Sequence, residues 1–119
     1  MKILLDNCVD IRAKRFFEKH EVLHARDLGW RDLENGKLLA AAAAGGFALF
    51  VTVDKNIRFQ QNLSVLPLSV LEIDVVKNRL ADLEGLRGFF KRAIEKTVEF
   101  RFVRIARDGA IETLAPKQQ

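Results

Sequence analysis

Two short segments of the sequence end an apolar run with an aspartate and place an asparagine close behind it. At the N-terminus, "MKILLDN" leads into Asp6 and Asn7. In the middle of the chain, "ALFVTVDKN" leads into Asp54 and then Asn56. Two neighbouring carboxylates repel each other, and a divalent cation relieves that repulsion. Mg²⁺ and Mn²⁺ prefer oxygen ligands, often one or two carboxylates with water and substrate phosphate. Such a metal positions a water and stabilises charge on a phosphodiester that is being cleaved.

The same residues also have a simpler structural use. Asp and Asn that follow a strand often cap the next helix or start a turn. Asp6 or Asn7 could cap a helix that begins near Val9, and Asp54 could start a turn. The coincidence of two strand-end acids, each with an asparagine nearby, favours a functional site over two independent caps.

The elements expected to carry these residues alternate between strand and helix. Apolar, partly β-branched runs predict four strands, at residues 2–5, 20–25, 48–53 and 68–73. Helical spacing and good helix formers predict three helices, at residues 9–19, 37–44 and 79–97, the last capped by Asn78. Residues 99–114 read as a strand, an Asp-Gly turn and a partner strand.

This order predicts one α/β domain, residues 1–119, with a mostly parallel sheet. Right-handed crossovers would place helices on both faces of that sheet. Because the carboxyl ends of parallel strands meet at one edge, where ligands bind, we expect Asp6 and Asp54 to lie along the same edge.

Composition is consistent with an intracellular protein that binds RNA. The net charge is +4, and the basic residues are spread evenly, with ten Lys/Arg in residues 1–60 and ten in residues 61–119. A basic balance helps approach to a polyanion, but solvated surface charge explains it equally well. Arg101, Arg104 and Arg107 could add a positive flank. Cys8 is the only cysteine, which fits a reducing cytosol. We find no signal peptide and no membrane span, and therefore expect a cytoplasmic location.

Several motifs together resemble a compact bacterial branch of the PIN-like domains, a superfamily that includes the toxin ribonucleases of toxin–antitoxin pairs. The motifs are "LLDN", "LGWRDLENGKLLAAA", "VTVDKN" and "FQQNL", and the resemblance covers about residues 1–75. It implies a three-layer α/β/α sandwich with a central parallel sheet. It also implies an acidic cluster that binds Mg²⁺ or Mn²⁺ and cleaves RNA, with an antitoxin as partner.

The resemblance assigns roles to individual residues. Asp6 matches the acid after the first strand, and Asp54 matches the acid of the Thr-x-Asp motif. Glu34, at the start of the middle helix, is the expected third metal ligand and catalytic acid, although a solvated first-turn acid favoured by the helix dipole is an equal alternative. Asp32 lies just before it. The chain departs from the family at Asn35 and Asn56, where acids are usual. An amide can ligate a metal but supplies no negative charge.

Substrate contacts are expected around the same edge. Lys55 and Arg58 could contact phosphates, and amide side chains could meet base edges or sugars. The amides are those of Asn7, Asn35, Asn56 and Gln61. A hydrophilic connection without a ligand is the alternative for this stretch. Phe59 could stack on a base or anchor the loop.

Three functions follow. The first is a metal-dependent endoribonuclease, the toxin of a toxin–antitoxin pair, with Asp6, Glu34 and Asp54 as catalytic and metal-binding residues. The second is a catalytically weak or inactive module of the same fold that binds RNA or protein, since two acids are replaced by asparagine. The third is a receiver-like domain, which needs an early acidic pair and a later strand-end lysine. The last strand could form an exposed edge of the sheet, through which two copies of the chain could pair as a homodimer.

Overall fold

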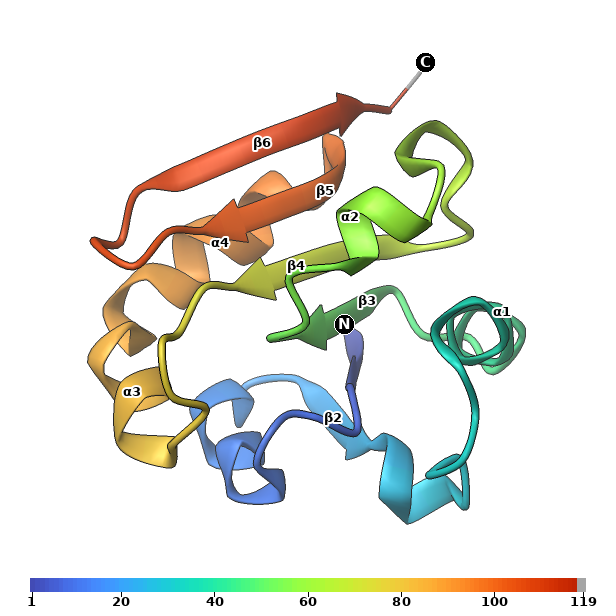
Figure 1. Cartoon of the computed structure of the whole chain (residues 1–119), viewed down its shortest axis with the longest axis horizontal. Helices are drawn as coiled ribbons and strands as arrows, with labels where there is room; N and C mark the ends of the chain where they lie inside the picture. Colours follow the sequence, from blue (N-terminus) through green and yellow to red (C-terminus); the bar gives the residue numbers. More distant parts are fainter. Residues whose placement is uncertain (118–119) are drawn as a thin grey trace.

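The computed structural model describes residues 1–117, and one six-stranded sheet forms its centre. The strands lie in the order β2-β1-β3-β4-β5-β6 (Figure 1). Their bounds are Lys2–Leu5 for β1, Glu21–His24 for β2, Leu49–Thr52 for β3, Ser69–Ile73 for β4, Phe100–Ile105 for β5 and Ile111–Pro116 for β6. Neighbouring strands from β2 to β5 pair in parallel, and β6 pairs antiparallel with β5. The prediction of an α/β chain with a mostly parallel sheet is confirmed.

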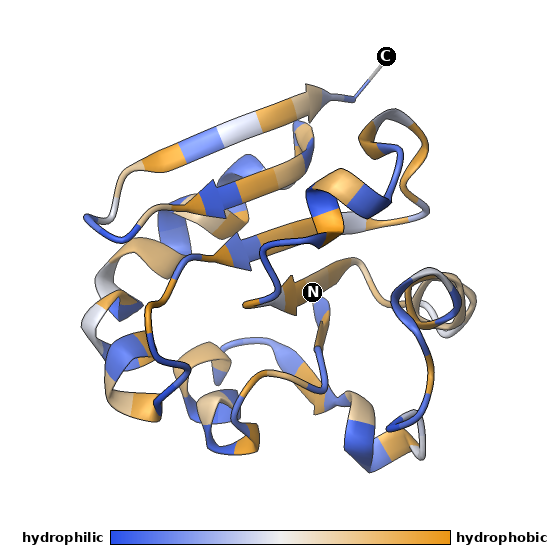
Figure 2. Cartoon of the chain, viewed as in Figure 1, coloured by the Kyte–Doolittle hydropathy of each residue, from blue (hydrophilic) through white to orange (hydrophobic). Residues whose placement is uncertain are grey.

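Each face of the sheet carries its own hydrophobic core, because successive residues of a strand point to opposite faces. The helical elements around the sheet are η1 (Ile11–Phe17), η2 (Ala25–Leu28), α1 (Asn35–Ala44), α2 (Ile57–Gln60), η3 (Leu63–Val65), α3 (Leu80–Gly85), η4 (Arg87–Phe89) and α4 (Phe90–Lys96). Side chains from η1, α3 and α4 share a core with Leu5, whereas side chains from α1 and α2 share one with Leu4. Figure 2 shows the strands as mainly hydrophobic, with hydrophilic colour near the arrowheads of β4 and β5.

The helix expected over residues 9–19 is instead a 3₁₀ segment, η1, that begins after Asp10. The Asp10 carboxylate caps it by accepting a hydrogen bond from the Arg12 N–H, so neither Asp6 nor Asn7 is the cap. In a 3₁₀ helix, residues three apart lie directly above one another. This geometry lets Ala13 and Phe16 face the sheet together, and both are buried.

The middle helix begins two residues earlier than expected, at Asn35, with Glu34 in the capping position. The Glu34 side chain makes no capping hydrogen bond. Helix α1 ends at Ala44 and Gly45 caps it. Gly46 follows with a φ of +82°, a conformation in which glycine avoids the steric cost of a Cβ. Leu38 and Ala42, on the inner face of α1, are fully buried.

The single helix expected over residues 79–97 is divided into α3, η4 and α4. Gly85 is the last residue of α3 and Gly88 lies within η4, and the low helix propensity of glycine lowers the cost of a break in this stretch. The predicted apolar stripe nevertheless holds, since Leu83, Leu86, Phe90 and Ile94 all lie in one core.

The prediction that Asn78 caps this helix is wrong. Arg79 occupies the capping position, and the Asn78 amide donates to the backbone carbonyl of Cys8 instead. Asn78 thereby ties the start of α3 to the loop after β1, a contact that depends on the tertiary structure.

The C-terminal hairpin forms as expected. Asp108 accepts a hydrogen bond from the Ala110 N–H, and Gly109 adopts a φ of +91°. Strand β6 is therefore one edge of the sheet, and β2 is the other. Within residues 1–117, none of the helices has the length and apolar character to cross a membrane.

Candidate functional site

The two strand-end acids lie on neighbouring parallel strands, as expected. Asp6 follows β1 and Asp54 follows β3 with one residue between. The Thr52 hydroxyl connects them, because it donates to Asp6 Oδ2 over 2.7 Å and accepts from the Asp54 N–H over 3.0 Å. Asp6 is buried, with 4% of its surface exposed, whereas Asp54 is half-buried. Thr52 therefore joins the buried carboxylate of Asp6 to the backbone of Asp54.

Hydrogen-bond donors surround the buried carboxylate of Asp6. Oδ1 accepts from the Asn7 N–H, and Oδ2 accepts from the Cys8 thiol as well as from Thr52. The Asn7 side chain turns away and donates to the carbonyl of Trp30 over 3.1 Å. The amide of Asn7 thus fixes the loop that contains Trp30.

Cys8 is exposed as a residue, but its sulfur is directed onto Asp6 and Thr52. Burial of the sulfur raises the pKa of the thiol to about 11, and the negative charge of Asp6 adds to the effect. A thiol with such a pKa stays protonated at neutral pH and can donate to Asp6. It is a poor nucleophile.

The second carboxylate, Asp54, organises an amide cluster. Its Oδ1 accepts from the Asn56 N–H over 2.9 Å, so Asp54 does start a turn, as the structural alternative predicted. Its Oδ2 accepts from Asn35 Nδ2 over 3.1 Å, and the same nitrogen lies 3.3 Å from Gln60 Oε1. Asp54 therefore connects β3 to the start of α1 and to α2.

Glu34, the expected third acid, lies beside this cluster. It lines an open depression of about 460 Å³ together with Asn35, Gly36, Gln60 and Gln61. Within residues 1–117, no three His, Cys, Asp or Glu side chains are grouped closely enough to hold a metal ion. Asp6 and Asp54 thus follow adjacent strands and are linked through Thr52, while Glu34 lines a separate depression.

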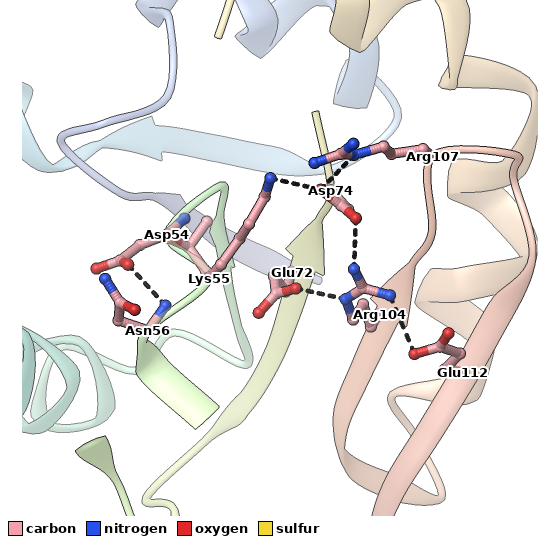
Figure 3. A network of polar contacts seen from close by, with 9 residues as sticks. Asp54, Lys55, Asn56, Glu72, Asp74, Arg104, Arg107 and Glu112 are labelled. Atoms are coloured by element: carbon pink, nitrogen blue, oxygen red, sulfur yellow. Dashed lines mark hydrogen bonds and ion pairs between the residues drawn. The ribbon is translucent and has the colours of Figure 1, made fainter. Parts of the chain in front are cut away.

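A row of polar residues continues from this pair across the sheet, on the face that carries α1 and α2. The strand register places Thr52 opposite Glu72, Glu72 opposite Arg104, and Arg104 opposite Glu112. Figure 3 shows Glu72, Arg104 and Glu112 of this row, with Asp74 just beyond the end of β4. The row links the strand-end acids to a buried ion-pair network.

Arg104 is the centre of that network. Its guanidinium contacts Glu72 Oε2 at 2.7 Å, Glu112 Oε2 at 3.1 Å and the carboxylate of Asp74. Glu72 is fully buried, and its Oε1 has no hydrogen-bond partner among the described residues. Burial raises the pKa of Glu72, although the hydrogen bond from Arg104 opposes the shift.

The same network holds Lys55, one of the expected phosphate contacts. Lys55 Nζ lies 2.8 Å from Asp74 Oδ1, and Arg107 Nε lies 3.3 Å from the same oxygen. Although burial by itself would raise it, the pKa of Asp74 is lowered by hydrogen bonds from Lys55 and Arg107 and by the nearby positive charges. Figure 3 shows Lys55 directed towards Asp74, away from Asp54.

The remaining expected contacts lie on or near α2. The Arg58 guanidinium stacks over Phe59, with 4.7 Å from Cζ to the ring centroid. Arg58 Nε is buried and without a hydrogen-bond partner in the described chain. Phe59 is 76% exposed, so it does not anchor the loop as one of the alternatives proposed.

The sequence reasoning missed Glu72 and Asp74. Asp74 directly follows an apolar strand, which is the signal that identified Asp6, so it could have been found. Glu72 gives no such signal, because an acid inside a strand reads as an exposed residue. Arg104 and Arg107 do not form a free positive flank, since carboxylates neutralise both.

Comparisons with protein-family models, with curated proteins and with solved structures find no significant match. What this site can do therefore has to be inferred from its own contacts and charges.

Proposed function

We propose that this chain is a PIN-like, metal-dependent endoribonuclease. The observation that carries the proposal is the link from Asp6 through the Thr52 hydroxyl to Asp54, at the carboxyl ends of two adjacent parallel strands. That edge is where open α/β sheets bind their ligands. The pair supplies two hard oxygen donors next to amide and basic side chains, a combination suited to RNA.

The architecture is compatible with the finer fold assignment. A mostly parallel sheet with a separate core on each face agrees with a three-layer α/β/α sandwich of the PIN-like type. Together with this fold, we propose that the protein is a cytoplasmic toxin that an antitoxin protein inhibits. Strand β6, at the edge of the sheet, is the segment through which a homodimer would extend it.

The donor set fits a hard divalent cation. A carboxylate offers about four lone-pair sites. Asp6 uses three of them on protein donors and Asp54 uses two. Both therefore retain acceptor capacity. Mg²⁺ commonly takes one or two carboxylates and fills its other positions with water and substrate oxygens.

Asp6 and Asp54 would hold Mg²⁺ or Mn²⁺, with Glu34 as a further proposed metal ligand and catalytic residue. The bound cation would supply Lewis-acid stabilisation of the phosphodiester and a water of lowered pKa. Thr52 orients Asp6, and Asn35 and Asn56 orient Asp54. These contacts preorganise the carboxylates before RNA arrives.

Lys55 and Arg58 are proposed to position the RNA backbone. A lysine ammonium has three donors, so Lys55 can keep its contact with Asp74 and still donate to a phosphate oxygen. Arg58 has a buried Nε without a partner and a guanidinium stacked on Phe59. Both residues follow Asp54 within four positions, which places them at the same strand end.

The test is cleavage of single-stranded RNA by the purified chain with Mn²⁺, compared with EDTA. We expect products with 5′-phosphate and 3′-hydroxyl ends, as the resemblance implies. Asp6→Asn and Asp54→Asn should each lower the rate by about a hundredfold or more, since loss of a metal ligand removes several kcal/mol of transition-state stabilisation. Asp32→Asn is the matched control, because it removes the same charge from an exposed loop position. Equal cleavage by all four proteins would reject the nuclease.

A non-catalytic RNA-binding module is the second candidate. Two observations favour it: within residues 1–117 no three potential ligands form a metal group, and amides occupy the positions around Asp54. In this case RNA binding would be the same in EDTA and in Mn²⁺. Calorimetric detection of a sub-millimolar Mn²⁺ site that disappears in Asp54→Asn would exclude this candidate.

A further inference from the structure

A polar depression of about 460 Å³ opens next to Asp54, at the start of α1. Glu34, Asn35, Gly36, Gln60 and Gln61 line it. Among the described residues that line it there is no Lys or Arg, so the depression lacks the cations that usually bind a phosphate. One carboxylate and three amides instead suit a neutral ligand whose edge carries several hydrogen-bonding groups.

Asp54 sets the orientation of the amides in this depression. A carboxylate only accepts hydrogen bonds, so Asn35 must present its NH₂ group to Asp54. The same NH₂ group then donates to Gln60 Oε1. Both donors of Asn35 are used, which leaves Asn35 Oδ1 as an acceptor and Gln60 Nε2 as a donor for a ligand.

The resulting pattern is rich in acceptors. Glu34 contributes a carboxylate that makes no capping hydrogen bond to α1. Asn35 contributes one carbonyl oxygen, and the Gln61 amide lies close to Gly36. A ligand that matches these groups has at least two N–H donors on one edge and an acceptor next to them for Gln60.

We propose that this depression binds a guanine base of single-stranded RNA, with the base N1–H and 2-amino group facing the Glu34 carboxylate. Guanine is the RNA base with two neighbouring N–H donors on its Watson–Crick edge, and a carboxylate has two acceptor oxygens to receive them. Adenine and cytosine place a ring-nitrogen acceptor beside their amino group, which would repel Glu34. The inference rests on the proposed function only in that RNA is the ligand, and it does not need catalysis. It assigns Glu34 to the base in place of the metal and leaves Asp6 and Asp54 as the metal ligands.

Helix α2 also offers a stacking surface for RNA. Phe59 directly precedes Gln60 and is 76% exposed, an unusual state for a large aromatic side chain. The Arg58 guanidinium packs against its ring and adds positive charge. A base stacked on Phe59 would contribute affinity without sequence preference. Discrimination between bases would therefore come from the depression.

The experiment measures binding in EDTA by fluorescence anisotropy, so that no cleavage occurs. The probes are oligouridines of about eight nucleotides, a length within the usual range of single-strand sites. Each carries one central guanosine, inosine, adenosine, cytidine or uridine. We expect the guanosine probe to bind about tenfold more tightly than the uridine probe, as for one good bidentate pair. Inosine lacks the 2-amino group and should lose most of that gain.

Glu34→Gln is the decisive variant. It keeps the size of the side chain, and Glu34 is exposed, so folding should be unaffected, as circular dichroism would verify. One acceptor oxygen becomes a donor that faces the guanine N–H groups. The tenfold preference should therefore vanish, so that this variant binds the guanosine and uridine probes equally. Asp32→Asn removes one charge nearby and should keep the preference.

The outcomes separate this inference from the nuclease. Equal affinity for all five probes, or a preference unchanged in Glu34→Gln, would overturn the guanine site even if Mn²⁺-dependent cleavage is observed. A guanine preference that needs Glu34 would support the site even if no cleavage occurs. Absence of RNA binding in both EDTA and Mn²⁺ would reject the two proposals together.

Discussion

The Thr52 hydroxyl donates a 2.7 Å hydrogen bond to Asp6 Oδ2, from the last residue of β3 to the residue that follows β1. Both partners are buried, with Thr52 fully so. Because the same hydroxyl accepts from the Asp54 N–H, one side chain sets the position of both strand-end acids. The hydroxyl two residues before Asp54 therefore connects the ends of β1 and β3.

Replacement of Thr52 by valine keeps the shape of the side chain and removes the hydroxyl. A buried carboxylate then loses a donor, so we expect the free energy of unfolding to fall by about 1–3 kcal/mol. Urea unfolding followed by circular dichroism measures this change. Thr52→Ser retains the hydroxyl and should lose less stability. A valine variant as stable as the parent would show that the bond to Asp6 is not needed.

The thiol of Cys8 should react slowly in the folded protein. Burial and the charge of Asp6 raise its pKa from an ordinary 9.0 to about 11. At pH 8 this lowers the thiolate fraction, and hence the alkylation rate, by about a hundredfold. Iodoacetamide labelling of native and urea-unfolded protein measures the ratio. Asp6→Asn should speed native labelling in part, because burial of the thiol remains. Equal labelling rates in native and unfolded chains would contradict the proposed thiol environment.

Loss of Arg104 should destabilise the fold more than loss of Glu112, its partner at the surface. Arg104→Met leaves Glu72 and Asp74 buried without their shared cation, which we expect to cost about 3–5 kcal/mol. Glu112→Gln is the matched control, since the Glu112 side chain is 49% exposed, and its removal should cost less than about 1 kcal/mol. Similar losses in the two variants, measured by urea unfolding, would rule out a buried network centred on Arg104.

Glu72 and Asp74 should make stability depend on pH in opposite directions. The pKa of Glu72 is raised in the folded state from its ordinary 4.5, so the folded chain binds more protons than the unfolded chain. Stability from this group is complete below about pH 4.5 and falls as the pH rises through the folded pKa. The pKa of Asp74 is lowered from 3.8, so its contribution is present above that pH and is lost on further acidification.

Glu72→Gln tests the pH dependence of stability that comes from Glu72. The variant should remove the decline in stability above about pH 4.5 and leave the loss below about pH 3.8, where Asp74 protonates. The groups that face Glu72 are Arg104, Arg58 and Asp74, and none of these changes charge in that upper window. Urea unfolding of both proteins across the pH series gives the difference. A difference that does not vary with pH would mean that Glu72 titrates normally.

Much of the fold could be predicted because local sequence carries it. Alternation of apolar runs with helical spacing identifies the parallel sheet, and Asp108-Gly109 identifies its final hairpin. The division of the last long helix into α3, η4 and α4 was harder to predict. Gly85 and Gly88 lower helix propensity only slightly each, and the core decides whether they interrupt a helix.

The site divides in a similar way. Asp6 and Asp54 were found because an acid after a buried strand stands out in sequence. Lys55 was assigned to phosphate, yet it contacts Asp74, a residue nearly twenty positions away. Glu72 was not found at all, since only its partner Arg104 on β5 makes a buried carboxylate on β4 tolerable.

By itself, the sequence of this protein determined which residues end the strands, because apolar periodicity and strand-end acids are local properties. The tertiary structure alone decided which of these residues meet. Parallel pairing brings Thr52 to Asp6 and places Arg104 between Glu72 and Asp74, and the position of α1 brings Asn35 to Asp54. Each of these contacts joins segments far apart in the chain, and strand register and side-chain packing, which no local pattern records, fix their geometry.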